Sequence, residues 1–233
     1  MGKQIFASAI FAGLGAGVLA FLLQFFLVNP LINEGELYET GMRVHFAASL
    51  DAPVQSPAGL DLTFERDVAR DAQTFGFNLI TYTAFGLLLV VGLALSERFG
   101  HVITPRQGVL WGFSGFAAVQ LAPALGLPPE LPGTVAAEMS ARQTWWIGTV
   151  LATGVGIGLI AFGRGFAMIV AGAVLILLPH LIGAPRLDTY FGIAPPELAA
   201  HFATTALAVS AANWVLLGAL ATYFWTRFAQ GPT

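Results

Sequence analysis

Six apolar segments divide the sequence, and each has about the length that a helix needs to cross a lipid bilayer. A transmembrane helix takes about 20 mostly apolar residues, with a range of about 17–25. The segments are roughly 4–28, 75–95, 107–126, 144–162, 165–183 and 201–226. This pattern predicts an all-α polytopic transmembrane helix bundle of about six spans. We expect it to form a single transmembrane domain over residues 1–233.

The composition agrees with a bilayer environment. Of the 233 residues, 56% are hydrophobic and 10% are charged, whereas charged residues make up about 25% of an ordinary soluble domain. The apolar run from Ile5 to Val28 is longer than the core of a cleaved signal, so we expect it to stay as the first span. The absence of cysteine excludes disulfides and thiolate metal sites, and the net charge of -3 gives no nucleic-acid signal.

The distribution of basic residues predicts the orientation. Cytoplasmic connections of membrane proteins are enriched in Lys and Arg. If the N-terminus is inside, the short inner connections and the ends carry five basic residues, Lys3, Arg98, Arg106, Arg164 and Arg227, and the short outer loops carry two, Arg142 and Arg186. The sequence therefore predicts a multi-pass protein of the bacterial inner membrane with both termini in the cytoplasm.

Two outer connections have distinctive sequences. Residues 29–74 form a long outer loop that is acidic at its start, where Glu36 lies, and ends in a charged stretch in which Asp67 and Arg70 could pair at i, i+3. Residues 121–146 contain Pro123, Pro128, Pro129 and Pro132, which stiffen the backbone and remove amide donors. We expect this half-apolar second loop to fold back into the mouth of the bundle.

An internal repeat links the outer loops. Gln120-Leu-Ala-Pro123 leads to Pro128-Pro-Glu-Leu131 and then to a span that begins at Trp145. Leu178-Pro179-His180 leads to Pro195-Pro-Glu-Leu198 and then to a span that holds Trp214. Pro30, followed by Glu36-Leu37, fits a more diverged copy. If the bundle closes on itself, the repeat predicts that Glu36, Glu130 and Glu197 converge at the outer mouth.

Histidine and carboxylate side chains near that mouth suggest a metal site. Glu197 and His201 are four residues apart, so they share a helix face, and His180 ends the fifth span at the same membrane level. Imidazole and carboxylate ligands suit divalent first-row ions such as cobalt, nickel or zinc. The alternatives are that Glu197 is an acid favoured by the helix dipole and that His201 is an interfacial side chain without a ligand role.

Glu138 and Arg142 are also four residues apart, just before Trp145 and Trp146. They suit an i, i+4 ion pair at a helix start. Alternatively, Arg142 braces a carboxylate that meets the substrate. Trp145 restarts the apolar run, where indole rings favour the headgroup region.

Several stretches resemble the CbtA family of cobalt transporter subunits. They are LWGFSGFAAVQLAPALGLPPELPG, ARQTWW, LLPHLIGAP and PPELAAHF, with VNPLINEGELYE as a looser match near the N-terminus. The resemblance implies an integral membrane protein for cobalt uptake linked to cobalamin synthesis, with a small single-span histidine-rich partner subunit. The family's motif positions correspond to Glu130, Arg142, Trp145, His180 and Glu197. The chain departs from the family pattern at Glu138, where Asp is frequent, at His201, and in having six rather than five predicted spans.

Together these observations predict a membrane permease subunit for a divalent transition-metal ion, with cobalt as substrate and no resident cofactor. The predicted outer recognition site consists of Glu130, Glu138, His180, Glu197 and His201, supported by Arg142, Trp145 and Glu36. A homo-oligomer is compatible with the sequence. Two other functions stay open: a membrane-embedded metal-dependent enzyme and a non-transporting scaffold subunit. The sequence has no P-loop, no H-E-x-x-H and no G-x-S-x-G motif.

Overall fold

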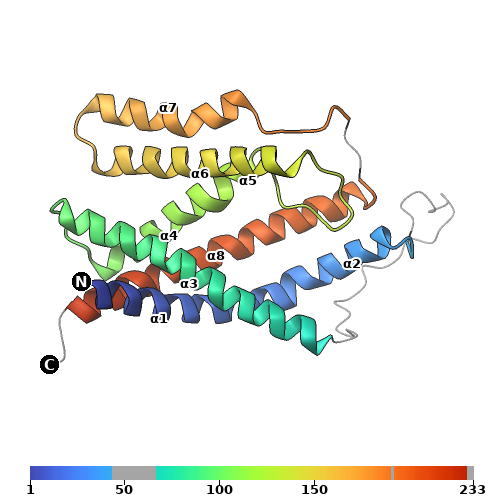
Figure 1. Ribbon diagram of the computed structural model, residues 1–233, viewed down its shortest axis with the longest axis horizontal. Coiled ribbons are helices and arrows are strands. Elements are labelled where there is room, and N and C mark those ends of the chain that lie inside the picture. Colours follow the sequence, from blue (N-terminus) through green and yellow to red (C-terminus); the bar gives the residue numbers. More distant parts are fainter. Residues whose placement is uncertain (44–66, 190–191, 230–233) are drawn as a thin grey trace.

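The computed structural model describes residues 1–43, 67–189 and 192–229, and in these ranges the chain is helical with no strand (Figure 1). The helical elements are α1 (Gly2–Leu23), η1 (Gln24–Val28), α2 (Asn29–Glu39), α3 (Val68–Arg98), η3 (Pro105–Gln107), α4 (Gly108–Phe116), η4 (Ala117–Leu121), α5 (Ala122–Ala124), α6 (Met139–Phe162), α7 (Phe166–Ile182) and α8 (Pro196–Ala229). The predicted all-helical bundle is confirmed.

The helices are long and apolar where the sequence predicts spans. Four described helical stretches could cross a membrane by length and composition, namely Gly2–Glu39, Val68–Arg98, Met139–Phe162 and Pro196–Ala229. The fifth predicted span is the shorter apolar helix α7. The third is divided into η3, α4, η4 and α5, which follow one another from Pro105 to Ala124. A helix suits lipid because it satisfies its backbone hydrogen bonds within one segment.

Two π-helical turns let helices continue past prolines. The Asn29 N–H donates to the Gln24 carbonyl, and the Ala122 N–H donates to the Ala117 carbonyl, five residues back in each case. A proline follows directly, Pro30 in α2 and Pro123 in α5. There it occupies the first turn of the next helical segment, where a missing N–H costs little. The prediction that the outer loop begins at residue 29 is therefore wrong for residues 29–39, which extend the first helix.

Small residues allow the helices to approach closely. A Cβ atom added at Gly13 would lie 2.3 Å from the Cα of Thr83, and one added at Gly17 would lie 2.9 Å from the Cα of Leu79. These glycines of α1 therefore seat the backbone of α3, as G-x-x-x-G spacing favours. On α6, Gly156 packs in the same way against Gly172 of α7.

The helices form a main bundle and a peripheral hairpin. The main buried core joins α1, α3, the segment around α4 and α8, with Leu93, Trp214, Leu217 and Trp225 almost fully buried. Helices α6 and α7 lie side by side as a hairpin along one side of this bundle (Figure 1). The apolar outer surface of α7 is largely exposed, as at Leu177 and Leu181. Such a surface suits contact with lipid tails.

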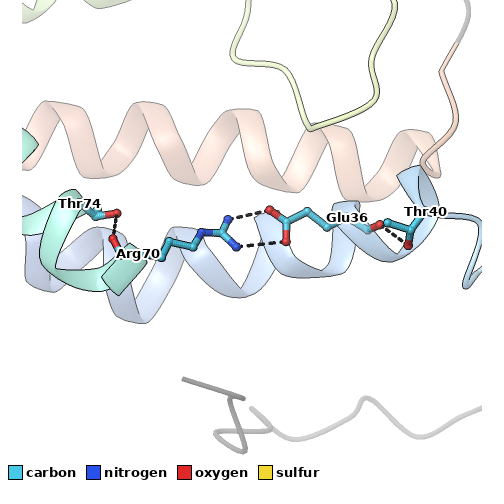
Figure 2. Close-up of polar contacts among 4 residues, drawn as sticks. All are labelled: Glu36, Thr40, Arg70 and Thr74. Carbon is cyan, nitrogen blue, oxygen red and sulfur yellow. Dashed lines mark hydrogen bonds and ion pairs between the residues drawn. The ribbon is translucent and has the colours of Figure 1, made fainter. Parts of the chain in front are cut away.

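An ion pair ties the extended first helix to the start of α3 (Figure 2). Arg70 Nη2 lies 2.6 Å from Glu36 Oε1, and Arg70 Nη1 lies 3.2 Å from Glu36 Oε2. The predicted Asp67–Arg70 side-chain pair does not form, because Asp67 Oδ1 instead accepts the backbone N–H groups of Ala69 and Arg70 as the N-cap of α3.

Candidate functional site

Three segments that are distant in the sequence meet at one end of the bundle. They are α2, the loop between α5 and α6, and the connection from α7 to α8. A Cβ atom added at Gly35 of α2 would lie 3.0 Å from Leu131 Cδ2, and one added at Gly133 would lie 3.1 Å from Glu39 Cγ and 3.3 Å from Ile193 Cδ1. The N-terminus and the C-terminal end of α8 lie at the opposite end of the bundle (Figure 1).

The proline-rich loop folds back onto the bundle, as expected. Leu131 is only 3% exposed and packs in a small apolar cluster with Val28, Phe202 and Val209. Because these partners come from the first and last long helices, the leucine holds the loop across the end of the bundle. The rigid backbone on either side of Leu131, which contains Pro129 and Pro132, can keep this position with little loss of chain entropy.

The folded loop forms one wall of a cavity of about 680 Å³. A second wall comes from the connection before α8, including Arg186 and Leu187, and a third from the first turns of α8, where Ala199, Ala200 and Ala203 line the space. Most of the described lining residues are Pro, Leu, Ala, Gly, Thr or Val, and the charged ones among them are Glu130, Arg142 and Arg186. This volume lies in the usual range of small-molecule sites, about 300–1,000 Å³.

Glu130 and Arg142 form an ion pair at this cavity. Arg142 Nη2 lies 2.6 Å from Glu130 Oε2, and the two side chains are 27% and 30% exposed. The pair connects the folded loop to the first turn of α6. Of the two roles considered for Arg142, the structure therefore matches the bracing of a carboxylate, with Glu130 as that carboxylate.

Glu138 acts as the N-cap of α6 instead of pairing with Arg142. Its Oε1 accepts the backbone N–H of Ser140 at 2.9 Å, and its Oε2 accepts the Ser140 hydroxyl at 2.5 Å and the backbone N–H of Ala141 at 2.8 Å. These donors, the Ser140 hydroxyl first, lower the pKa of Glu138 below the ordinary 4.5. The predicted Glu138–Arg142 ion pair is therefore wrong.

The lowered pKa of Glu138 predicts an acid-dependent loss of stability. A carboxyl whose pKa is depressed by folding contributes stability above its unfolded pKa and loses it as the pH falls through its folded pKa. We expect Glu138→Gln to lower the melting temperature at neutral pH, and the difference from the unsubstituted protein to shrink below about pH 4.5. Thermal unfolding of the detergent-solubilised protein across this pH range measures the effect. Ser140→Ala removes the largest cause of the shift, so its acid-dependent loss of stability should be smaller and should end at a higher pH than that of the unsubstituted protein; an unchanged loss would contradict this explanation.

His180 lies beside Trp145 where α7 packs on α6. Trp145 Nε1 donates to the Pro179 carbonyl at 3.1 Å, and the Trp145 and His180 rings meet edge to face with centroids 6.0 Å apart. His180 Nε2 is buried and has no hydrogen-bond partner among the described residues. Trp145 therefore contributes a specific link across the hairpin, beyond the headgroup preference expected from the sequence.

The predicted metal ligands are distributed over separate sites. Glu36 pairs with Arg70, Glu130 pairs with Arg142, and Glu138 caps α6. Glu197 and His201 lie exposed in the first turns of α8. Among the residues that the structure describes, no group of three or more His, Asp or Glu side chains is placed to hold a metal ion. The segments that carry Glu36 and Glu130 lie against each other at Gly35 and Leu131. The convergence of Glu36, Glu130 and Glu197 and a ligand role for the five predicted residues stay predictions.

Arg186 is a cavity residue that the sequence reasoning did not select. The sequence placed it in an outer loop only as one of two basic charges. One feature of the sequence could have pointed to Arg186. It lies between Pro185 and the Pro195-Pro196 pair, in a loop that repeats the sequence pattern around Glu130. The structure places it in the wall of the cavity, on the same side of the bundle as Arg142.

A comparison with protein families matches residues 3–226 to the family described as "Probable cobalt transporter subunit (CbtA)". No match was found among curated proteins or among solved structures. The family match covers the bundle, the folded loop and the cavity together, so it does not rest on one helix pair. The chain therefore belongs to the CbtA family, and it is a multi-pass membrane protein of the metal-transporter-subunit type.

Proposed function

We propose that this chain is the membrane-embedded permease subunit that brings cobalt into a bacterial cell, as a supply for cobalamin synthesis. The family match over residues 3–226 is the observation that carries the proposal. The architecture supports it, because the bundle places a cavity of about 680 Å³ at the end distant from the termini. A cavity at one membrane face is where a transported substrate would first be held.

We further propose that this cavity faces outward across the bacterial inner membrane. The basic residues Arg98, Arg106 and Arg164 lie in the connections at the other end of the bundle, near the N-terminus. The positive-inside rule favours the cytoplasm for that end. A small single-span histidine-rich subunit is the proposed partner, and it would add imidazole ligands that the described residues do not gather in one place.

Uptake of radiolabelled cobalt by bacterial cells that express the chain tests the proposal. We expect accumulation above that of cells with the empty vector, either with the chain alone or once the histidine-rich partner is co-expressed. Parallel cells would express His180→Ala and Glu197→Ala, with membrane abundance matched by immunoblotting. Comparison of these variants with the unsubstituted chain tests whether His180 and Glu197 take part in cobalt uptake.

The outcomes separate the function from the ligands. Uptake that both substitutions abolish would support the permease and both ligand roles. Normal uptake by both variants would retain the permease but remove the two residues from the recognition site. No uptake from the unsubstituted chain, with or without the partner and at normal membrane abundance, would contradict the permease and favour a scaffold role.

A further inference from the structure

The cavity at the end of the bundle carries an excess of positive charge. Glu130 is already paired with Arg142 at 2.6 Å, so those two charges offset each other. The third charged lining residue is Arg186, which is exposed and forms no ion pair within the described residues. Neither Asp188 nor Glu197, the acids nearest to it in the sequence, lines the cavity. Among the residues that the structure describes, no carboxylate therefore offsets the charge of this guanidinium.

The start of α8 forms a low wall of the cavity. Pro196 begins the helix and lines the cavity together with Ala199, Ala200 and Ala203. Glu197 lies in the first turn of α8, where its carboxylate offsets the partial positive charge of the helix start. The small alanine side chains leave room for a bound molecule to approach Arg186.

The lining is unsuited to a bare divalent cation. Cobalt prefers imidazole or carboxylate ligands, but the described lining residues include no histidine and no aspartate, and the one carboxylate among them, Glu130, is held by Arg142. A dication would also be repelled by the charge of Arg186. An anion meets the opposite conditions, because a guanidinium donates paired hydrogen bonds to a carboxylate.

We propose that this cavity binds a small polycarboxylate anion, and that cobalt enters it as an anionic carboxylate chelate and not as the free hydrated ion. Arg186 supplies the principal charge-assisted hydrogen bonds, and the Pro, Leu and Ala walls contact the carbon skeleton of the ligand. The statement about cobalt rests on the proposed function, whereas the statement about the anion does not. The cobalt complex of fully ionised citrate, which has a net negative charge, is a suitable probe.

Equilibrium binding of radiolabelled citrate, with and without cobalt, tests the anion site. The purified full chain is placed in nanodiscs of phosphatidylcholine, which has no net charge. We expect saturable binding that Arg186→Gln weakens by about tenfold, since a hydrogen bond to a charged group is worth about 1.5 kcal/mol or more. Arg186→Lys should retain part of the affinity, and Ala200→Phe should block binding by filling the cavity. Arg164→Gln removes the same charge from the connection between α6 and α7 at the other end of the bundle and should leave binding unchanged.

Two results of this assay would overturn the anion site. One is the absence of saturable citrate binding by the folded, unsubstituted protein. The other is equal weakening by Arg186→Gln and Arg164→Gln, which would indicate a general charge effect. A repeat in nanodiscs that contain anionic phosphatidylglycerol tests a lipid headgroup as the occupant. Loss of citrate binding there would assign the site to lipid and overturn the proposal, while retained, Arg186-dependent binding would support it.

Cobalt uptake into proteoliposomes separates this inference from the proposed function. We expect citrate to stimulate uptake by the unsubstituted protein and by Arg164→Gln, and to have little effect on Arg186→Gln. If cobalt uptake is complete without citrate, and citrate inhibits it equally in all three proteins, the chelate proposal is overturned. The proposed permease function is then retained. Arg186-dependent citrate binding without cobalt uptake in any condition would confirm the anion site and overturn the cobalt cargo.

Discussion

Replacing Trp214 with alanine is expected to lower the free energy of unfolding by about 3 kcal/mol, the low end of the range for truncating a buried aromatic residue. Trp214 is 1% exposed, its ring stacks on Phe85 with centroids 4.8 Å apart, and it fills the space beside Gly115. Alanine would leave a cavity between α3, α4 and α8. We expect the low end of this range because detergent still covers apolar side chains in the unfolded chain. The loss of packing contacts then contributes more to the change in unfolding free energy than the transfer of the side chain out of water.

Thermal unfolding of the purified protein in detergent measures this effect. Trp146→Ala is the matched control, because Trp146 lies 40% exposed on α6, and its loss should change the melting temperature little. Trp214→Phe should cost much less than Trp214→Ala, since it keeps an aromatic ring and removes a buried indole N–H that has no partner in the part of the chain that the structure describes. Equal shifts for the two tryptophan-to-alanine variants would contradict the packing role of Trp214.

Gly112→Ala is the second substitution with a large expected effect, although it adds a single methyl group. The new Cβ would lie 2.2 Å from the Trp214 carbonyl oxygen and 2.9 Å from the Cα of Val215. Both are backbone atoms of α8, so the helices must move apart, and overpacking of this kind costs about 1–3 kcal/mol. Alanine is otherwise favoured over glycine within a helix by about 1 kcal/mol, so a net loss would show that helix contact dominates.

Gly154→Ala provides the control for Gly112→Ala. Gly154 also lies within a membrane helix, but nothing comes within 4 Å of an added Cβ there, so its melting temperature should stay constant or rise. Gly218 faces Gly112 across the same contact, and its added Cβ would lie 2.4 Å from the Gly112 nitrogen. The double variant Gly112→Ala/Gly218→Ala should cost less than the sum of the two single variants, because the first substitution already separates the helices. Additive losses would contradict a shared contact.

The two arginine pairs show where sequence reasoning stops. Both Arg70 and Arg142 follow an acid one helical turn earlier, and in both cases sequence spacing suggested that the two side chains pair. In the structure the nearby acid caps the helix, and the arginine pairs with a distant glutamate, Glu36 or Glu130. The unpaired N–H groups of a helix start compete for the carboxylate that precedes it. Spacing alone could not weigh this competition.

The residues around the cavity were also only partly predictable. The proline-rich loop and its return to the bundle followed from its mixed composition, and the structure anchors it by Leu131. The sequence also indicated that the segments bearing Glu36 and Glu130 approach each other, and Gly35 does lie against Leu131. It did not indicate that Arg186 would line the same space without a partner, because that depends on how the connection between α7 and α8 lies against the other loop.

The sequence by itself determined the environment and the secondary structure of this protein. Apolar segments of spanning length must form helices in lipid, because no water is there to satisfy the backbone, and the small residues along α1 fixed where α3 could approach. Only the tertiary structure decided the electrostatics of the cavity. Its charge depends on which acids are used by helix caps and ion pairs, and the ion-pair partners lie 12 and 34 residues apart in the sequence.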